Sequence, residues 1–320
     1  MLRYKQPLLI SQGASAMLHR ILLAIVSITT LCTTACNMPK MTADMTVAVF
    51  TQASATVDKE PDIWFARTGS TANLKMFEGL LEVTPANRDL LLLTSQSFTR
   101  YALAFLEDDL ETLEEGSREY NEAHHRTTDF YHRGRRYAAL LLSLDYPDIA
   151  SALRGDGKRL DEILSQATVD HLPAIYWIAQ SWAGMINTNN DDPELLSDLP
   201  RVKRIMRWVV EHDDTYDNGG PNLFFGAVEL ALPVALGGNA KGSKAAFERA
   251  IDITDGKFLM AKALYARIYM RGTNNRDGYQ KILQSVIDAP NDIMPSERLA
   301  TEIAKVRAQR WLNEIDLVFE

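Results

Sequence analysis

The segment 237–244 has the glycine spacing of a phosphate-binding loop. Such a loop continues from its second glycine into Lys and then Ser or Thr, and it lies between a β-strand and a helix. Here Ser243 precedes Lys244, and the run 222–236 before the glycines has apolar residues at helical spacing. The sequence therefore predicts a turn between two helices, with one of the first two glycines at positive φ, and no nucleotide site.

A second candidate is a metal site on a charged helix. His125, Asp129 and His132 stand at i, i+4 and i+7, so two imidazoles and a carboxylate could face one way and bind zinc. Four arginines surround them and would repel a dication: Arg126, Arg133, Arg135 and Arg136. A solvated helix face is the favoured interpretation, and we predict no metal.

The acidic segment 211–222 collects carboxylates and amides near a predicted helix end. A calcium loop needs Gly at its sixth position and Glu at its twelfth. Counting from Asp213, these positions hold Asn218 and Phe224, so the segment fails that test. We predict a structural turn whose polar groups, including Asn222, lie at the mouth of a cavity.

Motifs for hydrolytic chemistry are absent from the sequence. It has no G-x-S-x-G, no H-E-x-x-H, and no cysteine after residue 36. The sequence therefore predicts a protein that is not an enzyme and uses no cofactor.

Aromatic residues on successive predicted helices are the remaining candidates for binding. Most of them should fill the core, because aromatic side chains dominate core burial. A subset could line a groove or channel, since stacked helical repeats leave a concave face. The predicted ligand- or cavity-lining residues are Tyr176, Trp177, Trp182, Asn222, Phe225, Tyr265 and Tyr269.

The first 35 residues have the composition of an export signal. They carry three basic residues and no acid, and the run 21–35 is uncharged and apolar. That run is too short for a stable membrane span, which needs about 20 apolar residues. Either Met1 or Met17 could be the true start, because the segment from Met17 is already a complete signal.

Cys36 follows the residues TTA, which resemble the end of a bacterial lipobox. The other cysteine, Cys32, lies inside the signal, so Cys36 would be unpaired after export, which favours lipidation, with palmitate among the acyl chains. Cleavage after Ala35 with a free thiol is the alternative. Asn37 stands where Asp would mark retention at the inner membrane, so we expect a periplasm-facing protein tethered to the outer membrane.

Loss of the three basic residues of the signal changes the net charge from −8 to −11. An acidic chain without a basic stripe argues against binding to nucleic acid and against direct adhesion to anionic lipid. We therefore expect the N-terminal lipid to be the only contact with the membrane.

The rest of the chain predicts helices joined by short polar turns, and no strand. Residues 36–60 are expected to be a tether with a short helix from Asp44, and residues 61–320 an all-α superhelix of degenerate tetratricopeptide-like helix pairs. Ser70 or Thr71 is predicted to cap the helix before Pro85. Asn87 is predicted to cap the next helix, and two charged helices are expected over residues 112–145.

Ser243, Phe247 and Ala250 have the spacing small-x3-Phe-x2-Ala. In a tetratricopeptide repeat this is the second helix, where the small residue permits close approach of helices and the aromatic ring fills the gap between them. We predict that Phe247 is buried between helices.

Several segments together resemble one family, among them NRDLLLLTSQSFTRYALAFLEDD, LPAIYWIAQSWAGMI and DDTYDNGGPNLFFGAVELALPVALGGNAKGSKAAFERAI. They are similar to the lipoprotein T-component of tripartite ATP-independent periplasmic (TRAP) transporters, over residues 60–320. The resemblance implies tetratricopeptide-type repeats, a partnership with the solute-binding protein, and no catalysis. Thr301 or Glu302 stands near a position where that family usually has Asn.

From the resemblance and the residues together we expect an accessory scaffold of a TRAP-type uptake system. It would dock the solute-binding protein and hold an organic ligand in an aromatic-lined cavity. A tetratricopeptide-type adaptor for outer-membrane or cell-wall assembly is the alternative. The ligand, the docking surface and the formation of a homo-oligomer stay open.

Overall fold

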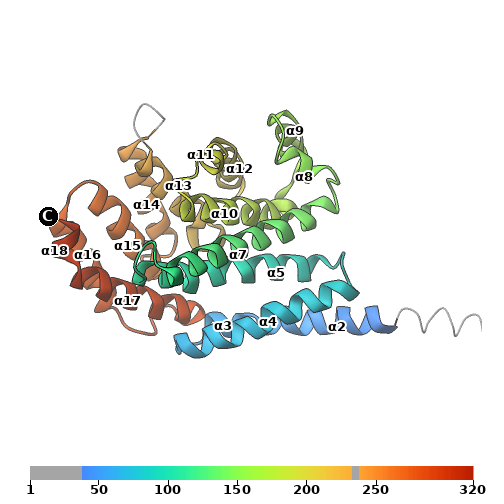
Figure 1. Ribbon diagram of the computed structural model, residues 1–320, viewed down its shortest axis with the longest axis horizontal. Coiled ribbons are helices and arrows are strands. Elements are labelled where there is room, and N and C mark those ends of the chain that lie inside the picture. Colours follow the sequence, from blue (N-terminus) through green and yellow to red (C-terminus); the bar gives the residue numbers. More distant parts are fainter. Residues whose placement is uncertain (1–37, 233–237, 320) are drawn as a thin grey trace, which may run out of the picture.

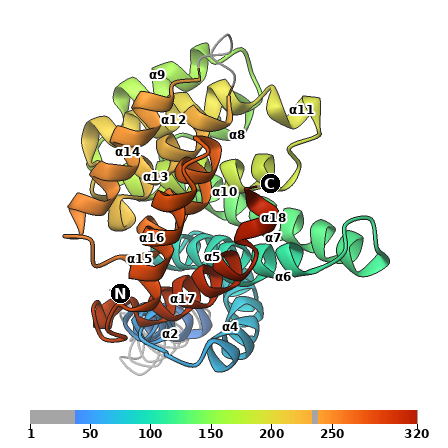
Figure 2. The ribbon, with the colours of Figure 1, turned by 90° about the vertical axis from the view of Figure 1, so that its left-hand side faces the viewer.

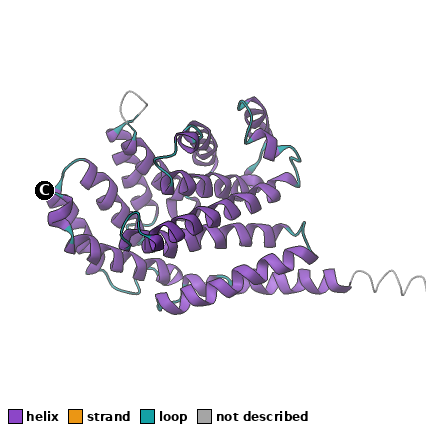
Figure 3. Cartoon of the chain, in the orientation of Figure 1, coloured by secondary structure: helices purple, strands orange, loops and turns teal. Residues whose placement is uncertain are grey.

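The computed structural model describes residues 38–232 and 238–319. The predicted signal, Cys36 and Gly237 lie outside these residues. The described chain consists of helices and loops and contains no strand (Figure 3). The prediction of an all-α protein is confirmed. The superhelical, tetratricopeptide-like arrangement stays a prediction.

The N-terminal half of the described chain forms the long helices α2, α4, α5 and α7 and several short ones (Figure 1). Helices α5, η1 and α6 follow one another without a break, and η1 is a turn of π-helix. The elements are α2 (Met38–Ala53), α3 (Ala55–Asp58), α4 (Ile63–Val83), α5 (Arg88–Tyr101), η1 (Ala102–Leu106), α6 (Glu107–Thr112), α7 (Arg118–Ser143), α8 (Ile149–Ala152) and α9 (Lys158–Gln166).

The C-terminal half continues with helices of similar length. Helix α13 contains three residues that are not helical, at 217–219. The elements are η2 (Val169–His171), α10 (Leu172–Thr188), α11 (Pro193–Leu196), α12 (Leu199–His212), α13 (Tyr216–Ala231), α14 (Ala240–Ile253), α15 (Leu259–Leu264), η4 (Tyr265–Met270), α16 (Arg276–Ile287), η5 (Pro295–Glu297), α17 (Arg298–Asn313) and α18 (Ile315–Val318).

Helices α5, α7 and α10 lie against one another in the middle of the molecule. Small residues bring them together. Ser95 Oγ donates to the Gly134 carbonyl at 2.8 Å, and the hydroxyls of Thr99 and Ser181 lie 2.7 Å apart. A Cβ atom at Gly134 would collide with the Thr99 hydroxyl. These helices therefore pack at a distance that only small side chains permit.

Helix α17, near the C-terminus, packs against α3 and α4 in the N-terminal part of the chain (Figure 2). Arg307 on α17 is buried and donates to the carbonyls of Leu103 and Ala104 at 2.7 and 3.3 Å. Both carbonyls belong to the π-turn η1, where the usual α-helical bonds are interrupted. Arg307 also pairs with Asp108 at 3.2 Å, so α17 is fixed to the α5–α6 helix by charge-assisted bonds.

The predicted burial of Phe247 is confirmed. Ser243, Phe247 and Ala250 are fully buried on α14, which packs on α13. Ser243 Oγ donates to the Gly226 carbonyl at 2.5 Å, and a Cβ atom at Gly226 would lie 2.8 Å from the Phe247 ring. The Phe247 ring of α14 thus packs directly against the backbone of α13 at Gly226.

The segment between α13 and α14 has a helix on each side. Asn239 caps α14 by accepting from the Gly242 amide at 2.9 Å. Lys244 lies inside α14, half exposed, and pairs with Glu248 at 3.5 Å. The strand that a phosphate-binding loop requires is not among the described residues before it, which supports the prediction of a turn.

Three boundaries expected from the sequence are wrong. The first helix begins at Met38 and not at Asp44. Helix α4 begins after Asp62, whose side chain accepts from the Phe65 amide; Ser70 and Thr71 instead bond back to carbonyls within the helix. A single helix, α7, spans residues 118–143 where two were expected, because no proline interrupts it before Ser143.

Within the described ranges, no helix is long and apolar enough to cross a membrane.

Candidate functional site

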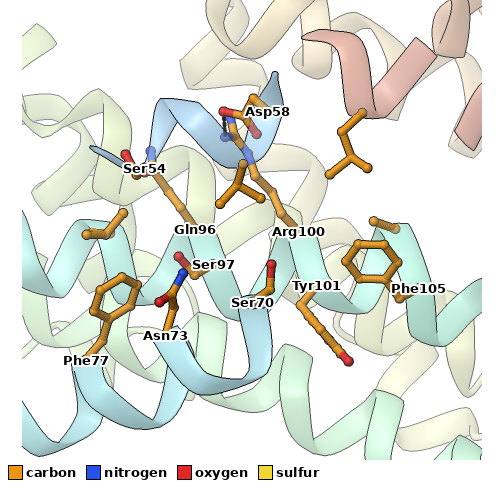
Figure 4. A pocket seen from close by; sticks show the side chains of 14 residues that line it. Ser54, Asp58, Ser70, Asn73, Phe77, Gln96, Ser97, Arg100, Tyr101 and Phe105 are labelled. Carbon is orange, nitrogen blue, oxygen red and sulfur yellow. Dashed lines mark hydrogen bonds and ion pairs between the residues drawn. The ribbon is translucent and has the colours of Figure 1, made fainter. Parts of the chain in front are cut away.

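A cavity of about 110 Å³ lies where α3, α4 and α5 meet (Figure 4). Hydroxyl, amide and charged groups share its wall with apolar side chains. The lining residues are Ser54, Val57, Asp58, Ser70, Asn73, Phe77, Leu93, Gln96, Ser97, Arg100, Tyr101, Ala104, Phe105 and Leu299. Such a mixture of apolar surface and a few convergent polar groups is typical of a site for a small molecule.

Arg100 provides the positive charge of the cavity wall. It donates to Asp217 at 2.7 Å and to Asp58 at 3.3 Å, and its guanidinium lies 5.3 Å from the centre of the Trp177 ring. The side chain nevertheless keeps 43% of its surface accessible. Arg100 is therefore held in place from the protein side and can still meet a molecule in the cavity.

Asp217 reaches Arg100 from an unusual turn at the start of α13. Asp217, Asn218 and Gly219 all have left-handed backbones, with φ of 50°, 58° and 81°. Left-handed φ is uncommon for residues other than glycine and is found preferentially at functional sites. The Tyr176 hydroxyl donates to Asp217 at 2.9 Å, and a Cβ atom at Gly220 would collide with that hydroxyl. The turn thus depends on a glycine.

A third carboxylate completes a charged cluster of Asp58, Arg100, Asp217 and Glu297. Glu297 accepts from Asn218 Nδ2 at 3.1 Å. Burial raises the pKa of Asp58 above its ordinary value despite the attraction of Arg100. Burial also raises the pKa of Glu297, although Asn218 donates to it. Asp58 and Glu297 therefore take up a proton more readily than exposed carboxyls do.

The residues weighed as a metal site, His125, Asp129 and His132, lie on α7 beside His124. His124 bonds the Thr188 carbonyl at 2.8 Å, and Asp129 pairs with Arg133 at 3.1 Å. Among the residues that the structure describes, no group of three or more His, Cys, Asp or Glu side chains could hold a metal ion.

A model of the TRAP transporter T-component family matches residues 59–319 of the chain. The protein belongs to the T-component family. A relative from Treponema pallidum (strain Nichols), described as an uncharacterized protein, is 26% identical over 242 residues, which is 75% of each chain. The resemblance seen in the sequence is confirmed, and residue 59 as the start of the match is close to the expected residue 60.

In this T-component, the predicted cavity residues on α10 are buried. Tyr176 and Trp177 lie behind the charged cluster, where Trp177 Nε1 donates to the Tyr216 hydroxyl at 3.3 Å. Trp182 packs against two guanidinium groups, Arg135 at 4.6 Å and Arg201 at 5.7 Å from the ring centre. These residues hold the core together around the cluster.

The other predicted residues of the T-component lie on α13 and η4. Asn222 donates to the Asp214 carbonyl at 2.8 Å, and Phe225 packs on Phe224. Tyr265 and Tyr269 are stacked, with ring centres 5.3 Å apart. None of the seven predicted residues lines the cavity beside Arg100. Their role in holding a ligand stays a prediction.

Sequence reasoning missed the residues that line the cavity. Asp58, Arg100 and Leu299 stand far apart in the chain, and α17 brings Leu299 to the first helices only through the fold. One signal was present: Arg100 is the single cation within the apolar run 90–106. A charge within an apolar helix is costly unless it is paired, so it marks a place where partners must converge.

Proposed function

We propose that this T-component is a periplasm-facing lipoprotein that docks the solute-binding protein and holds a small organic solute. The T-component family is associated with TRAP transporters, so the chain is an accessory of such a system. The observation that carries the proposal is the family match over residues 59–319, which covers most of the cavity wall and three residues of the charged cluster, Arg100, Asp217 and Glu297.

The chemistry of the cavity supports a bound solute with a polar or anionic end. Arg100 could turn from Asp58, to which its bond is the longer one, and donate to the solute instead. Asp58 would then take up a proton, which its raised pKa favours. The apolar body of the solute would pack on Phe77, Leu93 and Phe105. The cavity offers binding and no activated nucleophile, which supports a role without catalysis.

The first turn of α4 offers a docking surface for the solute-binding protein. Trp64 and Phe65 are 71% and 60% exposed there, although large aromatic residues are usually covered. Aromatic anchors are the side chains that contribute most to protein interfaces. The same helix continues to the cavity through Ser70 and Asn73, so a partner at Trp64 would stand close to the bound solute.

Co-purification from detergent-solubilised membranes tests the docking. The solute-binding protein of the same TRAP system should co-purify with the wild-type chain. The double variant Trp64→Ala/Phe65→Ala should reduce that yield at least about tenfold. A tenfold loss of affinity corresponds to about 1.4 kcal/mol of binding free energy. Val169→Ala is the matched control, because Val169 is 61% exposed at η2. Equal yields from all three proteins would contradict the proposed surface.

The lipid at Cys36 has its own test. Cys36→Ser should move the protein from the membrane fraction to the soluble periplasmic fraction. Mass spectrometry of the wild-type N-terminus should find the added acyl chains. A wild-type protein with a free Cys36 thiol would contradict the lipoprotein proposal.

A further inference from the structure

Helix α2 is fixed to the rest of the protein by one face. Ala43 and Val47 are buried against the core. Asp44 accepts from Thr84 Oγ1 and from Asn87 Nδ2, both at 2.7 Å. The helix is therefore attached through its apolar inner face and through a half-buried carboxylate, Asp44, at the turn between α4 and α5.

The outer face of α2 is apolar and uncovered. Met41, Met45 and Val49 recur every four residues and are 58%, 68% and 65% exposed. The other exposed residues of the helix are Lys40, Thr42, Ala48, Thr51, Gln52 and Ala53. Lys40, at the beginning of the helix, is the one charged residue among these. A stripe of three large apolar side chains without charges is unusual on an acidic protein.

We infer that this outer face of α2 lies on the surface of the lipid bilayer. The inference rests on the proposed lipid at Cys36. Helix α2 begins at Met38, so a single residue, Asn37, separates the modified cysteine from the helix. The two Cα–Cα steps from Cys36 to Met38 span at most about 7 Å. The first turn of α2 must therefore lie at the membrane interface whenever the acyl chains are inserted.

The position and chemistry of the stripe favour a bilayer over another protein as its occupant. Interfacial helices bury a row of large apolar side chains at the boundary between headgroups and acyl chains. The net charge of −11 opposes adhesion to anionic lipid, but the exposed face of α2 contributes no negative charge. A contact through apolar side chains would thus supplement the lipid, which the sequence alone suggested was the only attachment.

A single label can test this geometry. After export the sole cysteine is Cys36, which carries the lipid, so Met45→Cys introduces one free thiol for the environment-sensitive dye NBD. Lipidated, labelled protein is reconstituted in phosphatidylcholine–phosphatidylethanolamine vesicles with and without doxyl-labelled lipid. Val169→Cys is the control, because this exposed residue lies at η2, between α9 and α10.

The label at position 45 should shift to shorter wavelength in vesicles and be quenched by doxyl lipid several-fold more than the label at position 169. Equal, water-like emission from both labels on protein that carries its lipid would overturn the inference and leave the lipoprotein proposal intact. Protection of position 45 only after the solute-binding protein is added would also overturn it, because the face would then be a protein interface. Absence of the lipid would overturn both.

Discussion

Helix α5 takes part in two regions that differ in packing and charge, one around Gly134 and one around Arg100. At Gly134, small residues from α5, α7 and α10 meet so closely that a single added methyl group would collide. Arg100, the residue after Thr99 on α5, pairs with Asp58 and Asp217, has Glu297 nearby, and lies beside a left-handed turn and a cavity. The first region is packed and neutral, and the second is hollow and charged.

The difference indicates that two parts of α5 have different roles: one fixes the position of the helix, and the other places Arg100 at the cavity. Close packing gives α5 a fixed position, because interiors at this density resist displacement. A fixed helix can then hold a charged side chain at the edge of a cavity. On a mobile helix the same side chain would point into the solvent. Left-handed residues at 217–219 are tolerated for the same reason, since the surrounding structure determines their conformation.

The largest effect is expected from Phe247→Ala, at a second close contact with a glycine, between α13 and α14. The ring is fully buried against Gly226 and removing it leaves a cavity, so the free energy of unfolding should fall by about 3–5 kcal/mol. Urea unfolding followed by circular dichroism measures this. A loss below about 1 kcal/mol would mean that the α13–α14 contact is not as close as described.

Gly134→Ala tests the close approach of α5, α7 and α10 directly. The added Cβ atom would meet the Thr99 hydroxyl and lie 3.3 Å from the Ser95 carbonyl, so we expect a loss of about 1–3 kcal/mol. Gly79→Ala on α4 is the matched control, because nothing lies within 4 Å of its Cβ position. It should stabilise the protein by up to about 1 kcal/mol, since Ala favours helix over Gly. Equal effects of both changes would refute the packing argument.

The stability that the charged cluster contributes should depend on pH in the opposite sense from that of an ordinary ion pair, whose carboxylate has a lowered pKa. The pKa of Asp58 is raised in the folded protein, so the stability it contributes is full below its ordinary pKa of about 3.9 and is lost as the pH rises through the raised value. Asp58→Asn should therefore flatten the fall in stability above about pH 4. Its cost at pH 7 should stay below about 1 kcal/mol.

Thermal unfolding from pH 3.5 to 7 measures this change. Asp156→Asn is the control, because Asp156 is 69% exposed and pairs only loosely with Lys158 at 3.9 Å. An unchanged slope in Asp58→Asn would show that Asp58 titrates as a surface carboxyl.

The smallest effect is expected at Lys244. Its ammonium is half exposed and pairs with Glu248 within α14, so Lys244→Ala should change stability by less than about 0.5 kcal/mol. Millimolar ATP or GTP should not shift the melting temperature, because ligands stabilise only a protein that binds them. A nucleotide-dependent shift that disappears in Lys244→Ala would contradict the turn between α13 and α14.

Local features of the packing could be predicted from the sequence, but the close contact at Gly134 and the charged cluster could not. The burial of Phe247 and the cap at Asn87 follow from local spacing, which a sequence displays. The cluster of Asp58, Arg100, Asp217 and Glu297 joins four distant segments and depends on a left-handed turn. Aromatic residues were better markers of core than of cavity, because Tyr176 and Trp177 are buried behind the cluster.

The central claim is that the cavity beside Arg100 holds a solute, and native mass spectrometry tests it most directly. Protein purified without denaturation should carry a small organic molecule, and Arg100→Gln should lose it. Arg88→Gln is the matched control, because Arg88 also forms a two-bond ion pair, with Asp145 at 2.6 and 2.7 Å, but lies outside the cavity. It should retain the molecule. Equal retention by both variants, or a wild-type protein without any bound molecule, would contradict the claim.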